Sequence, residues 1–262
     1  MKELLELKIR KIIRETTDTI SLELENTDGT ALNYIAGQFL TFLFNINGKE
    51  LRRSFSLSSA PYLDKYPSVT IKRMENGEIS RYIFDHIRPG DILTSLYPTG
   101  KFTLPTDNTI PRDIFLVGGG SGITPLFALL KTILQKMPQH HTTLLYANHD
   151  ETSTIFYRQL NTLQEENPRR FTLIYFFSNP SGKSNISAAG DISTGKHHDL
   201  PAGEPLTPGR DLNQGRLNNS LLEELVNSHF HYEKDKAEFF LCGPASLMRM
   251  AQLTLIFMGF RK

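Results

Sequence analysis

Hydrophobic and polar residues alternate in short runs from Leu4 to about Leu104. The runs are rich in β-branched and aromatic residues, which is typical of half-buried strands. They read LELKIRKII, DTISLELE, FLTFLFNI, RRSFSLSS, SVTIKR and DILTSLY. Turn residues at Asn26–Gly29, Asn47-Gly48 and Pro89-Gly90 separate several runs and favour antiparallel connections. The pattern predicts a small closed antiparallel β-barrel over residues 1–107.

One stretch of the first half has a helical period instead. In GEISRYIFDHI, the residues Ile79, Ile83 and Ile87 recur at every fourth position, which places them on one face of a helix. We expect this short helix to interrupt the strands.

The period changes after the segment LPTDNTIPRD, so the domain boundary is expected near residues 106–111. Beyond it, apolar strand-like runs alternate with helical ones in the βαβ manner that implies a parallel sheet. The expected strands are 113–117, 142–148, 171–177 and 238–242. The expected helices lie near 125–136, 154–166, 218–228 and 245–257. Residues 111–262 are therefore predicted to form an α/β domain.

One part of this second half lacks an apolar period. Between Asn179 and Arg216 the chain is too polar and too rich in glycine, proline and serine to bury a face. We expect a flexible insertion at about 179–216, with a docking loop as the alternative interpretation.

The overall charge argues against two classes of partner. The chain carries 29 basic and 28 acidic residues, a formal net charge of +1, which gives no electrostatic footprint for nucleic acid or an anionic membrane. No apolar run approaches the roughly 20 residues of a bilayer span, and the amino terminus has no signal-peptide pattern. We therefore expect a cytoplasmic protein.

The single cysteine, Cys242, excludes disulfides within the chain and a four-cysteine metal cluster.

A glycine-rich turn opens the second half. In FLVGGGSGITPLFALL an apolar strand runs into glycines, and Thr124-Pro125 opens the following helix. Proline suits the first helical position because it lacks the N–H that would go unpaired there. The free N–H groups of such a helix start bind phosphate well. The turn predicts a dinucleotide site, although a glycine-rich turn without a ligand is the open alternative.

A second candidate is the strand LRRSFSLSSAP. Alternation places one set of side chains on one face and three hydroxyls on the other. The first set is Arg53, Phe55 and Leu57, and the second is Ser54, Ser56 and Ser58. A guanidinium suits phosphate oxygens, but an edge strand with a solvated polar face would show the same pattern.

A third cue lies in TIKRMENGEIS. Lys72 and Arg73 close a strand, and Gly77 and Ser80 lie at a helix start where N–H groups are free for a pyrophosphate. Two anion sites in one small barrel favour a dinucleotide cofactor there.

Four motifs in this order resemble those of the ferredoxin-NADP reductase superfamily, and the resemblance covers nearly the whole chain. Arg53-Ser54-Phe55-Ser56 is similar to its Arg-x-Tyr-Ser flavin motif, and Gly77–Ser80 to its pyrophosphate turn. Gly120–Pro125 resembles its nicotinamide-nucleotide turn, and Cys242-Gly243-Pro244 its Cys-Gly-Pro signature. Within the superfamily the chain is most similar to the flavin reductase portions of bacterial ring-hydroxylating and phenylacetate-degrading oxygenase systems.

The resemblance implies FAD in the barrel, with FMN not excluded by the sequence. Arg53, with Ser54 beside it, would hold the flavin phosphates, Phe55 would pack on the isoalloxazine and Ser56 would hydrogen-bond flavin N5. Lys72 or Arg73 would lie near the phosphates, capped by backbone of Gly77, Ile79 and Ser80. Phe55 replaces the commoner tyrosine, which keeps the stacking and loses a phenolic hydrogen bond.

The resemblance also implies NADH or NADPH in the second domain. Its pyrophosphate would lie on Gly119, Gly120, Gly122, Thr124 and Pro125. Cys242, Gly243 and Pro244 would lie beside the nicotinamide, so that Ser56 and Cys242 flank the hydride path, although a lone thiol is often inert core.

The choice of coenzyme depends on the loop after residue 148. NADP-specific relatives often carry an arginine where this chain has His149, and a mostly neutral imidazole is a weaker phosphate partner than a guanidinium. This favours NADH. A solvated loop histidine is the open alternative, and Arg158 on the following helix offers a compensating cation.

The function implied is electron transfer from NAD(P)H through FAD to an iron–sulfur, ferredoxin-type or flavodoxin acceptor. Many relatives continue into a [2Fe–2S] ferredoxin domain, so the acceptor would be either such a domain beyond this chain or a separate protein. A free-standing flavin reductase, a nitric-oxide-detoxifying reductase module and a non-catalytic nucleotide-binding module are the alternatives.

Overall fold

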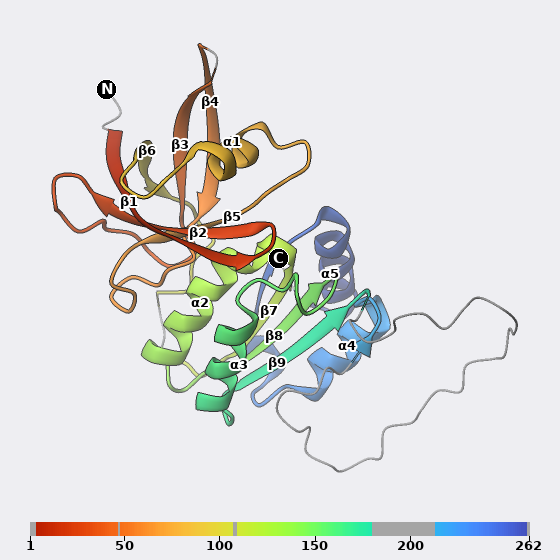
Figure 1. The fold of residues 1–262 in the computed structure, drawn as a ribbon. Helices are drawn as coiled ribbons and strands as arrows, with labels where there is room; N and C mark the ends of the chain where they lie inside the picture. Colours follow the sequence, from red (N-terminus) through yellow and green to blue (C-terminus); the bar gives the residue numbers. More distant parts are fainter. Residues whose placement is uncertain (1–3, 47, 107–108, 180–212, 261–262) are drawn as a thin grey trace, which may run out of the picture.

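The computed structural model describes residues 4–46, 48–106, 109–179 and 213–260. Figure 1 shows two lobes, an antiparallel sheet built by the first part of the chain and a parallel sheet with helices built by the second. The predicted division into a β lobe followed by an α/β lobe is therefore the one observed.

The first lobe is a strongly curved antiparallel sheet with the strand order β4-β3-β6-β1-β2-β5. Its strands are β1 (Leu4–Thr16), β2 (Thr19–Asn26), β3 (Phe39–Ile46), β4 (Lys49–Ser56), β5 (Ser68–Lys72) and β6 (Ile92–Thr99). The two ends of the sheet meet at one isolated bridge between Leu57 and Val69, beside which the Ser58 and Thr70 hydroxyls lie 2.8 Å apart. The prediction of a closed barrel is corrected to a half-barrel, because β4 and β5 touch at this bridge instead of pairing along their length.

The helix α1 (Glu78–His86) covers the core of this half-barrel. Its predicted stripe is confirmed, since Ile79, Ile83 and Ile87 are only 4%, 1% and 7% exposed. On β1, the residues Leu5 and Leu7 are buried while their neighbours are exposed, as period-two alternation requires.

The second lobe is a parallel sheet with the strand order β10-β9-β8-β7-β11. Its strands are β7 (Asp113–Gly119), β8 (His141–Asn148), β9 (Phe171–Phe177), β10 (Asn213–Gln214) and β11 (Ala237–Cys242). Its helices are α2 (Ile123–Lys136), α3 (Tyr157–Glu166), α4 (Asn219–Ser228) and α5 (Ala245–Phe257), with short 3-10 turns η1 (Gly120–Gly122) and η2 (Lys234–Lys236). The predicted helix 154–166 begins later than expected, because Phe156 adopts a left-handed conformation with φ of 62°.

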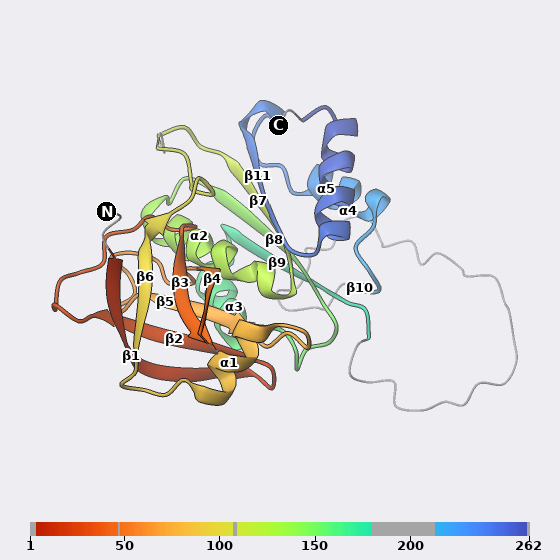
Figure 2. The ribbon, with the colours of Figure 1, turned by 90° about the horizontal axis from the view of Figure 1, so that it is seen from above.

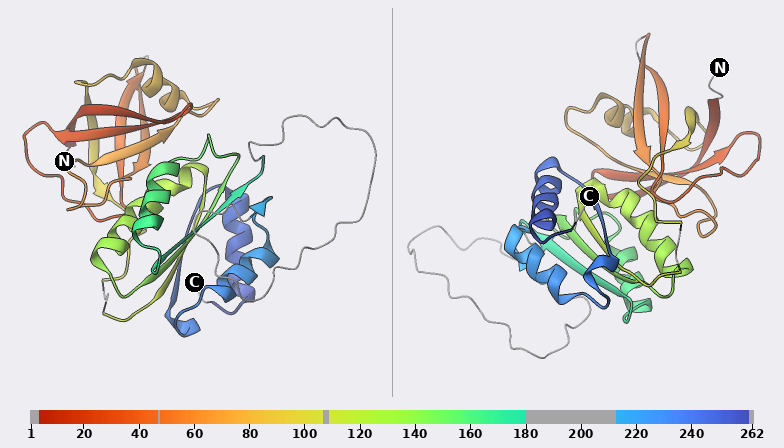
Figure 3. Two further views of the ribbon diagram at one scale, coloured as in Figure 1. Left: turned by 60° about the horizontal axis from the view of Figure 1, so that its bottom comes forward. Right: turned by 180° about the vertical axis from the view of Figure 1, so that it is seen from behind.

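The four helices cover both faces of the parallel sheet, α2 and α3 on one and α4 and α5 on the other (Figure 2, Figure 3). Along β7 the side chains of Ile114 and Leu116 pack under α2 and α3, whereas Phe115 and Val117 pack under α4 and α5. A strand buried on both faces reads as a continuous apolar run, which is why DIFLV has no polar interruption after its first residue.

The expected insertion at 179–216 falls largely outside the described residues, which resume at Asn213. Asn213 and Gln214 form β10 and pair in parallel with Phe176 and Phe177 of β9. The last residues of the expected insertion are therefore part of the sheet.

The two lobes contact each other through a small apolar cluster and through polar pairs. Ala36 of the half-barrel packs with Ala128 and Leu129 of α2, and the rings of Phe102 and Phe240 meet edge to face at 5.5 Å. Asp64 of the half-barrel pairs with Lys131 of α2, and Gln159 of α3 donates to Glu15 of β1 at 3.2 Å. These contacts fix how the lobes face each other.

Across the described part of the chain, none of the helices combines the length and the apolar character needed to cross a bilayer.

Candidate functional site

The glycine-rich turn lies where β7 ends, and its glycines are required by close packing. A Cβ on Gly122 would lie 2.1 Å from the carbonyl oxygen of Cys242. A Cβ on Gly119 would lie 2.7 Å from Leu247 Cδ2 and 2.8 Å from Pro244 Cδ. Gly120 has a φ of +52°, a left-handed conformation that glycine adopts without strain.

The Cys-Gly-Pro segment forms the other side of this contact. β11 pairs with β7 so that Cys242 lies opposite Gly118, and a Cβ on Gly243 would lie 2.9 Å from the backbone nitrogen of Gly119. Two motifs more than a hundred residues apart in the sequence therefore touch backbone to backbone. The structure brings together the two segments that the sequence assigned to the nicotinamide nucleotide.

The turn η1 and the start of α2 offer backbone N–H groups to a ligand, apart from the Ile123 N–H, which donates to the Gly120 and Ser121 carbonyls. No side chain among the described residues caps η1 or α2, and the first N–H groups of a helix have no partner within it. α2 begins at Ile123, so Pro125 is its third residue and not its first. It still lies in the first turn, where its missing N–H removes no helical hydrogen bond.

Two hydroxyls hold the turn in place. The buried Thr124 donates from Oγ1 to the Ser121 carbonyl at 3.0 Å, and Tyr146 donates to the Gly120 carbonyl at 2.9 Å. The Thr124 hydroxyl is thus engaged within the turn, and its expected place at the coenzyme pyrophosphate stays a prediction.

A cleft of about 560 Å³ opens above the turn and includes residues of both lobes. It is lined, among others, by Lys72, Gly119, Gly120, His149, Arg216 and Pro244. Lys72 closes β5 of the half-barrel, where it pairs with Asp18 at 3.3 Å. The cleft therefore lies between the flavin-type lobe and the nucleotide-type lobe.

The wall of the cleft at the end of β8 carries a buried donor. The Nδ2 atom of Asn148 is buried, and the Asn148 side chain lies beside the Tyr146 hydroxyl. His149 follows it, with Nδ1 3.3 Å from the Ser178 hydroxyl. The end of β8 thus brings an amide and an imidazole to the wall of the cleft.

The arginine and serine strand, β4, forms one edge of the half-barrel sheet. Arg53 is exposed, while Phe55 packs against the core with its ring 6.2 Å from that of Phe42. On the opposite face the hydroxyls of Ser54 and Thr41 lie 2.8 Å apart. The alternative interpretation of this segment as an edge strand is thus confirmed for its place in the sheet. At this edge the guanidinium of Arg53 is accessible.

The two basic residues at the end of β5, Lys72 and Arg73, point in different directions. Lys72 lines the cleft, whereas Arg73 turns toward α1 and donates to Asp85 at 3.2 Å. Ser80 donates to the Gly77 carbonyl at 3.1 Å and accepts from Met74 N at 3.0 Å. These two hydrogen bonds stabilise the turn before α1. Within the described ranges no side chain caps α1, which leaves its first N–H groups for an anion.

The predicted site residues thus fall into two groups. Those around the cleft are Lys72, Gly119, Gly120, His149 and Pro244, joined by backbone contact to Gly122, Cys242 and Gly243. Those elsewhere are Arg53, Ser54, Phe55, Ser56, Arg73, Gly77, Ile79, Ser80, Thr124 and Pro125, which are not among the residues that line it.

The sequence reasoning missed five polar residues that line the cleft, namely Asn148, Ser178, Ser153, Arg216 and Ser246. The first two lie at or directly after the ends of parallel strands, a position that marks ligand sites in open α/β sheets. That signal was available in the sequence.

Cys242 is partly buried, and burial raises the pKa of its thiol. The thiol therefore stays protonated near neutral pH and is a poor nucleophile. The expected place of Cys242 beside the nicotinamide stays a prediction.

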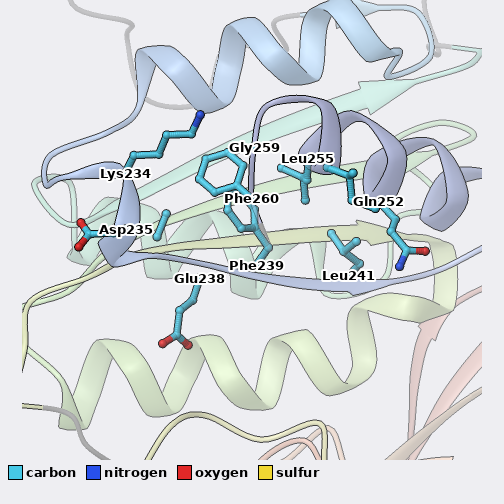
Figure 4. Close-up of a pocket in the computed structure, with 11 residues that line it drawn as sticks. Lys234, Asp235, Glu238, Phe239, Leu241, Gln252, Leu255, Gly259 and Phe260 are labelled. Atoms are coloured by element: carbon cyan, nitrogen blue, oxygen red, sulfur yellow. The ribbon is translucent and has the colours of Figure 1, made fainter. Parts of the chain in front are cut away.

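A second, larger cavity of about 810 Å³ lies on the far side of the sheet along β11. Figure 4 shows Phe239, Leu255 and Phe260 in its wall, with Lys234 and Asp235 at one end. Its described lining is mainly apolar and contains no residue of the glycine turn, so it differs in chemistry from the cleft between the lobes.

Comparison with known families divides the chain in the same place as the fold. An oxidoreductase FAD-binding domain model matches residues 4–104. An oxidoreductase NAD-binding domain model matches residues 116–194. The chain therefore takes FAD and NAD(P)H as cofactors.

Two related proteins align with most of the chain. A component of 1,2-phenylacetyl-CoA epoxidase from Escherichia coli K12 is 31% identical over 255 residues, covering 97% of this chain and 64% of the relative. The ferredoxin reductase component of 3-ketosteroid-9-alpha-monooxygenase from Rhodococcus rhodochrous is 35% identical over 179 residues, covering 67% of this chain and 50% of the relative. The chain thus spans between half and two thirds of the length of these relatives.

A solved structure shows the same fold at full length. The ferredoxin NADP+ reductase from Neisseria gonorrhoeae, with bound FAD and NADP, aligns with a TM-score of 0.73 and 20% identity, covering 100% of this chain and 94% of that one. The chain is an NAD(P)H-dependent flavoprotein oxidoreductase and belongs to the ferredoxin-NADP reductase family.

Proposed function

We propose that the chain is the reductase part of an oxygenase-type electron-transfer system, which takes electrons from NAD(P)H and passes them through FAD to a [2Fe–2S] ferredoxin-type acceptor. One observation carries the proposal. Lys72 of the FAD-binding lobe and Gly119 and Gly120 of the NAD-binding lobe line the same cleft, so ligands of the two lobes would meet there.

The nucleotide lobe offers a cradle that fits a dinucleotide pyrophosphate. Gly119, Gly122 and Gly243 leave room that a Cβ would fill, and the uncapped start of α2 supplies N–H donors. Asn148 adds an amide to the lining of the cleft. In this arrangement the chain contributes fixed donors and a shape, which is how a protein places a coenzyme for hydride transfer.

The half-barrel would hold the flavin at its β4 edge and at the start of α1. Arg53 has an exposed guanidinium for phosphate oxygens, and the uncapped α1 offers N–H groups beside it in the proposed site. Phe55 and Ser56 would contact the ring system. When bound, FAD supplies the conversion of a two-electron hydride into single electrons.

The residues assigned to the hydride path, Ser56 and Cys242, would act by position. The Cys242 thiol stays neutral because burial raises its pKa, and hydride transfer needs no acid or base from the protein. Their role would be to exclude water and to fix the distance between the two rings at about 3–3.5 Å.

The acceptor is proposed from the names of relatives. Two relatives are a component of an epoxidase and a ferredoxin reductase component of a monooxygenase. We therefore expect a ferredoxin-type [2Fe–2S] domain or protein to receive the electrons.

A panel of acceptors tests the proposal. The FAD-loaded chain would oxidise NAD(P)H in the presence of a plant-type [2Fe–2S] ferredoxin, with cytochrome c as reporter, and in parallel with free FAD and FMN. Cytochrome c reduction that depends on ferredoxin supports the proposal. NAD(P)H oxidation that is as fast with free FAD or FMN as with ferredoxin would indicate a flavin reductase instead. If NAD(P)H is oxidised with none of the acceptors, the chain is not an enzyme of this kind.

A further inference from the structure

A buried tyrosine hydroxyl lies directly behind the glycine turn. Tyr146 belongs to β8 and is fully buried, and it is not among the residues that line the cleft. Its ring lies next to Gly118, where an added Cβ would be 3.5 Å from Tyr146 Cδ2. Its hydroxyl donates to the Gly120 carbonyl at 2.9 Å. Tyr146 therefore reaches the turn from inside the protein, whereas a ligand would reach it from the cleft.

The Gly120 carbonyl oxygen is fully occupied by this contact and one other. Besides the Tyr146 hydroxyl it accepts from the Ile123 N–H, and a carbonyl oxygen has two lone pairs. The two bonds hold the peptide between Gly120 and Ser121 with its oxygen turned into the protein. The turn then offers N–H groups to an anion, as do other turns that contain a left-handed residue.

Steric contacts do little to hold this peptide in place. Gly120 has a φ of +52°, and a Cβ added there would meet no atom within 4 Å. Glycine adopts both signs of φ about equally well, so the peptide can rotate without a clash at this residue. A rotated peptide would point its oxygen at the cleft, where it would repel phosphate oxygens because both are negative. The orientation of the peptide therefore depends on its hydrogen bonds.

The same hydroxyl contacts two further segments of the cleft wall. Its oxygen interacts with the Asn148 side chain and with the backbone N–H of Ile155. Asn148 lines the cleft at the end of β8, and Ser153, two residues before Ile155, lines it from the loop that follows. Burial raises the pKa of the Tyr146 hydroxyl, so the group stays protonated at neutral pH and remains a donor to Gly120.

We propose that Tyr146 is a positioning residue for the coenzyme, whose hydroxyl keeps the Gly120 carbonyl turned inward and so preserves the N–H groups that receive the pyrophosphate. The proposal rests on the proposed function, because it takes the glycine turn as the pyrophosphate site. Tyr146 touches no ligand in this account and acts only through the turn.

The variant Tyr146→Phe removes one oxygen atom and keeps the ring that packs beside Gly118. Tyr175→Phe is the matched control. Tyr175 lies opposite Tyr146 in the neighbouring strand β9, is equally buried, and donates to the Tyr157 carbonyl at 3.4 Å instead of to the glycine turn. Both variants lose a buried hydroxyl and should lose some thermal stability, but only Tyr146→Phe should affect the coenzyme.

Two measurements on the FAD-loaded chain test the proposal. The first is calorimetric binding of ADP, which carries the pyrophosphate and cannot reduce the flavin. The second is kcat and KM for NADH and for NADPH with ferricyanide as acceptor, which needs no protein partner.

Tyr146→Phe should weaken ADP binding about 10-fold, because the Gly120 carbonyl loses a buried partner. The KM for whichever coenzyme the wild type uses should rise by the same factor, while kcat stays close to the wild-type value, as expected for a contact that supports the ground state and the transition state alike. FAD content should be unchanged, and Tyr175→Phe should match the wild type in both measurements.

Three results would overturn the inference. They are wild-type ADP binding and KM in a folded Tyr146→Phe protein, an equal loss in Tyr175→Phe, and a fall in kcat without a change in KM. Failure of the proposed function looks different, because then the wild type itself would neither bind ADP nor reduce ferricyanide with NADH or NADPH.

Discussion

Replacement of Gly122 by alanine should push the glycine turn away from the end of β11, the two segments that form the coenzyme site. The new Cβ would lie 2.1 Å from the Cys242 oxygen and 2.4 Å from the Cys242 carbonyl carbon, where ordinary contacts begin at 3.4 Å. Both neighbours are backbone atoms, so no side chain can swing aside. Relief requires the turn and the end of β11 to separate by about 1.3 Å.

A shift of this size is large for hydride transfer. A misplacement of about 1 Å can lower a rate about 100-fold, so Gly122→Ala should slow flavin reduction by that order. Its FAD content should stay at the wild-type level, because the half-barrel is untouched. Anaerobic stopped-flow mixing with NAD(P)H measures the rate, and the ratio of flavin absorbance to protein measures the content.

Gly118→Ala is the matched control for this prediction. Its Cβ would lie 3.0 Å from Leu126 Cδ1, the mobile end of a side chain that can move by a few tenths of an ångström. It should therefore reduce flavin at nearly the wild-type rate. Wild-type kinetics in a folded Gly122→Ala protein, or the same loss in both variants, would refute the reasoning.

Three further predictions concern the flavin, the contact between the lobes and acid stability. Arg53→Ala should weaken FAD binding about 10- to 100-fold without unfolding the chain; unchanged flavin content after purification would remove Arg53 from the phosphate site. Lys131→Met and Asp64→Asn should each slow flavin reduction, and a double-mutant cycle on unfolding should give a coupling of about 1 kcal/mol; strictly additive effects would contradict the pairing. Burial lowers the pKa of His140, whose Nδ1 accepts from Arg112 N at 3.1 Å, so the unfolded chain binds the proton more readily and stability should fall as the pH drops through about 6.5. His140→Asn, with an amide oxygen as acceptor, should lose less Tm than the wild type on acidification, and parallel losses would show that His140 is not responsible.

Local patterning was sufficient for the elements of the parallel sheet. Burial on both faces left an apolar run in β7, and the strand 171–177 and the helix 245–257 have the predicted bounds. How far the barrel closes was not predictable in this way, because β4 and β5 meet only at the bridge between Leu57 and Val69. Likewise the left-handed Phe156 is held by stacking on Phe127, with ring centroids 4.2 Å apart, a contact that the residues of the loop do not reveal.

The candidate site was predictable where short motifs encode backbone geometry. The glycine turn ends in Pro125 where the common fingerprint has a third glycine, and the structure shows why glycine is not needed there. The close approach is made by Gly122 against Cys242 and by Gly243 against Gly119, so it occurs between the glycine turn and the end of β11. Arg216 escaped prediction because it follows a long polar segment, and only the pairing of β10 with β9 places it in the cleft.

The account depends on the two lobes presenting their ligands to each other across one cleft. Anaerobic mixing of the FAD-loaded chain with NAD(P)H tests this most directly, with the absorbance of the oxidised flavin band at about 450 nm as the readout. The account predicts that the band is bleached by one equivalent of NAD(P)H. A chain that binds both FAD and NAD(P)H and yet stays yellow would contradict it.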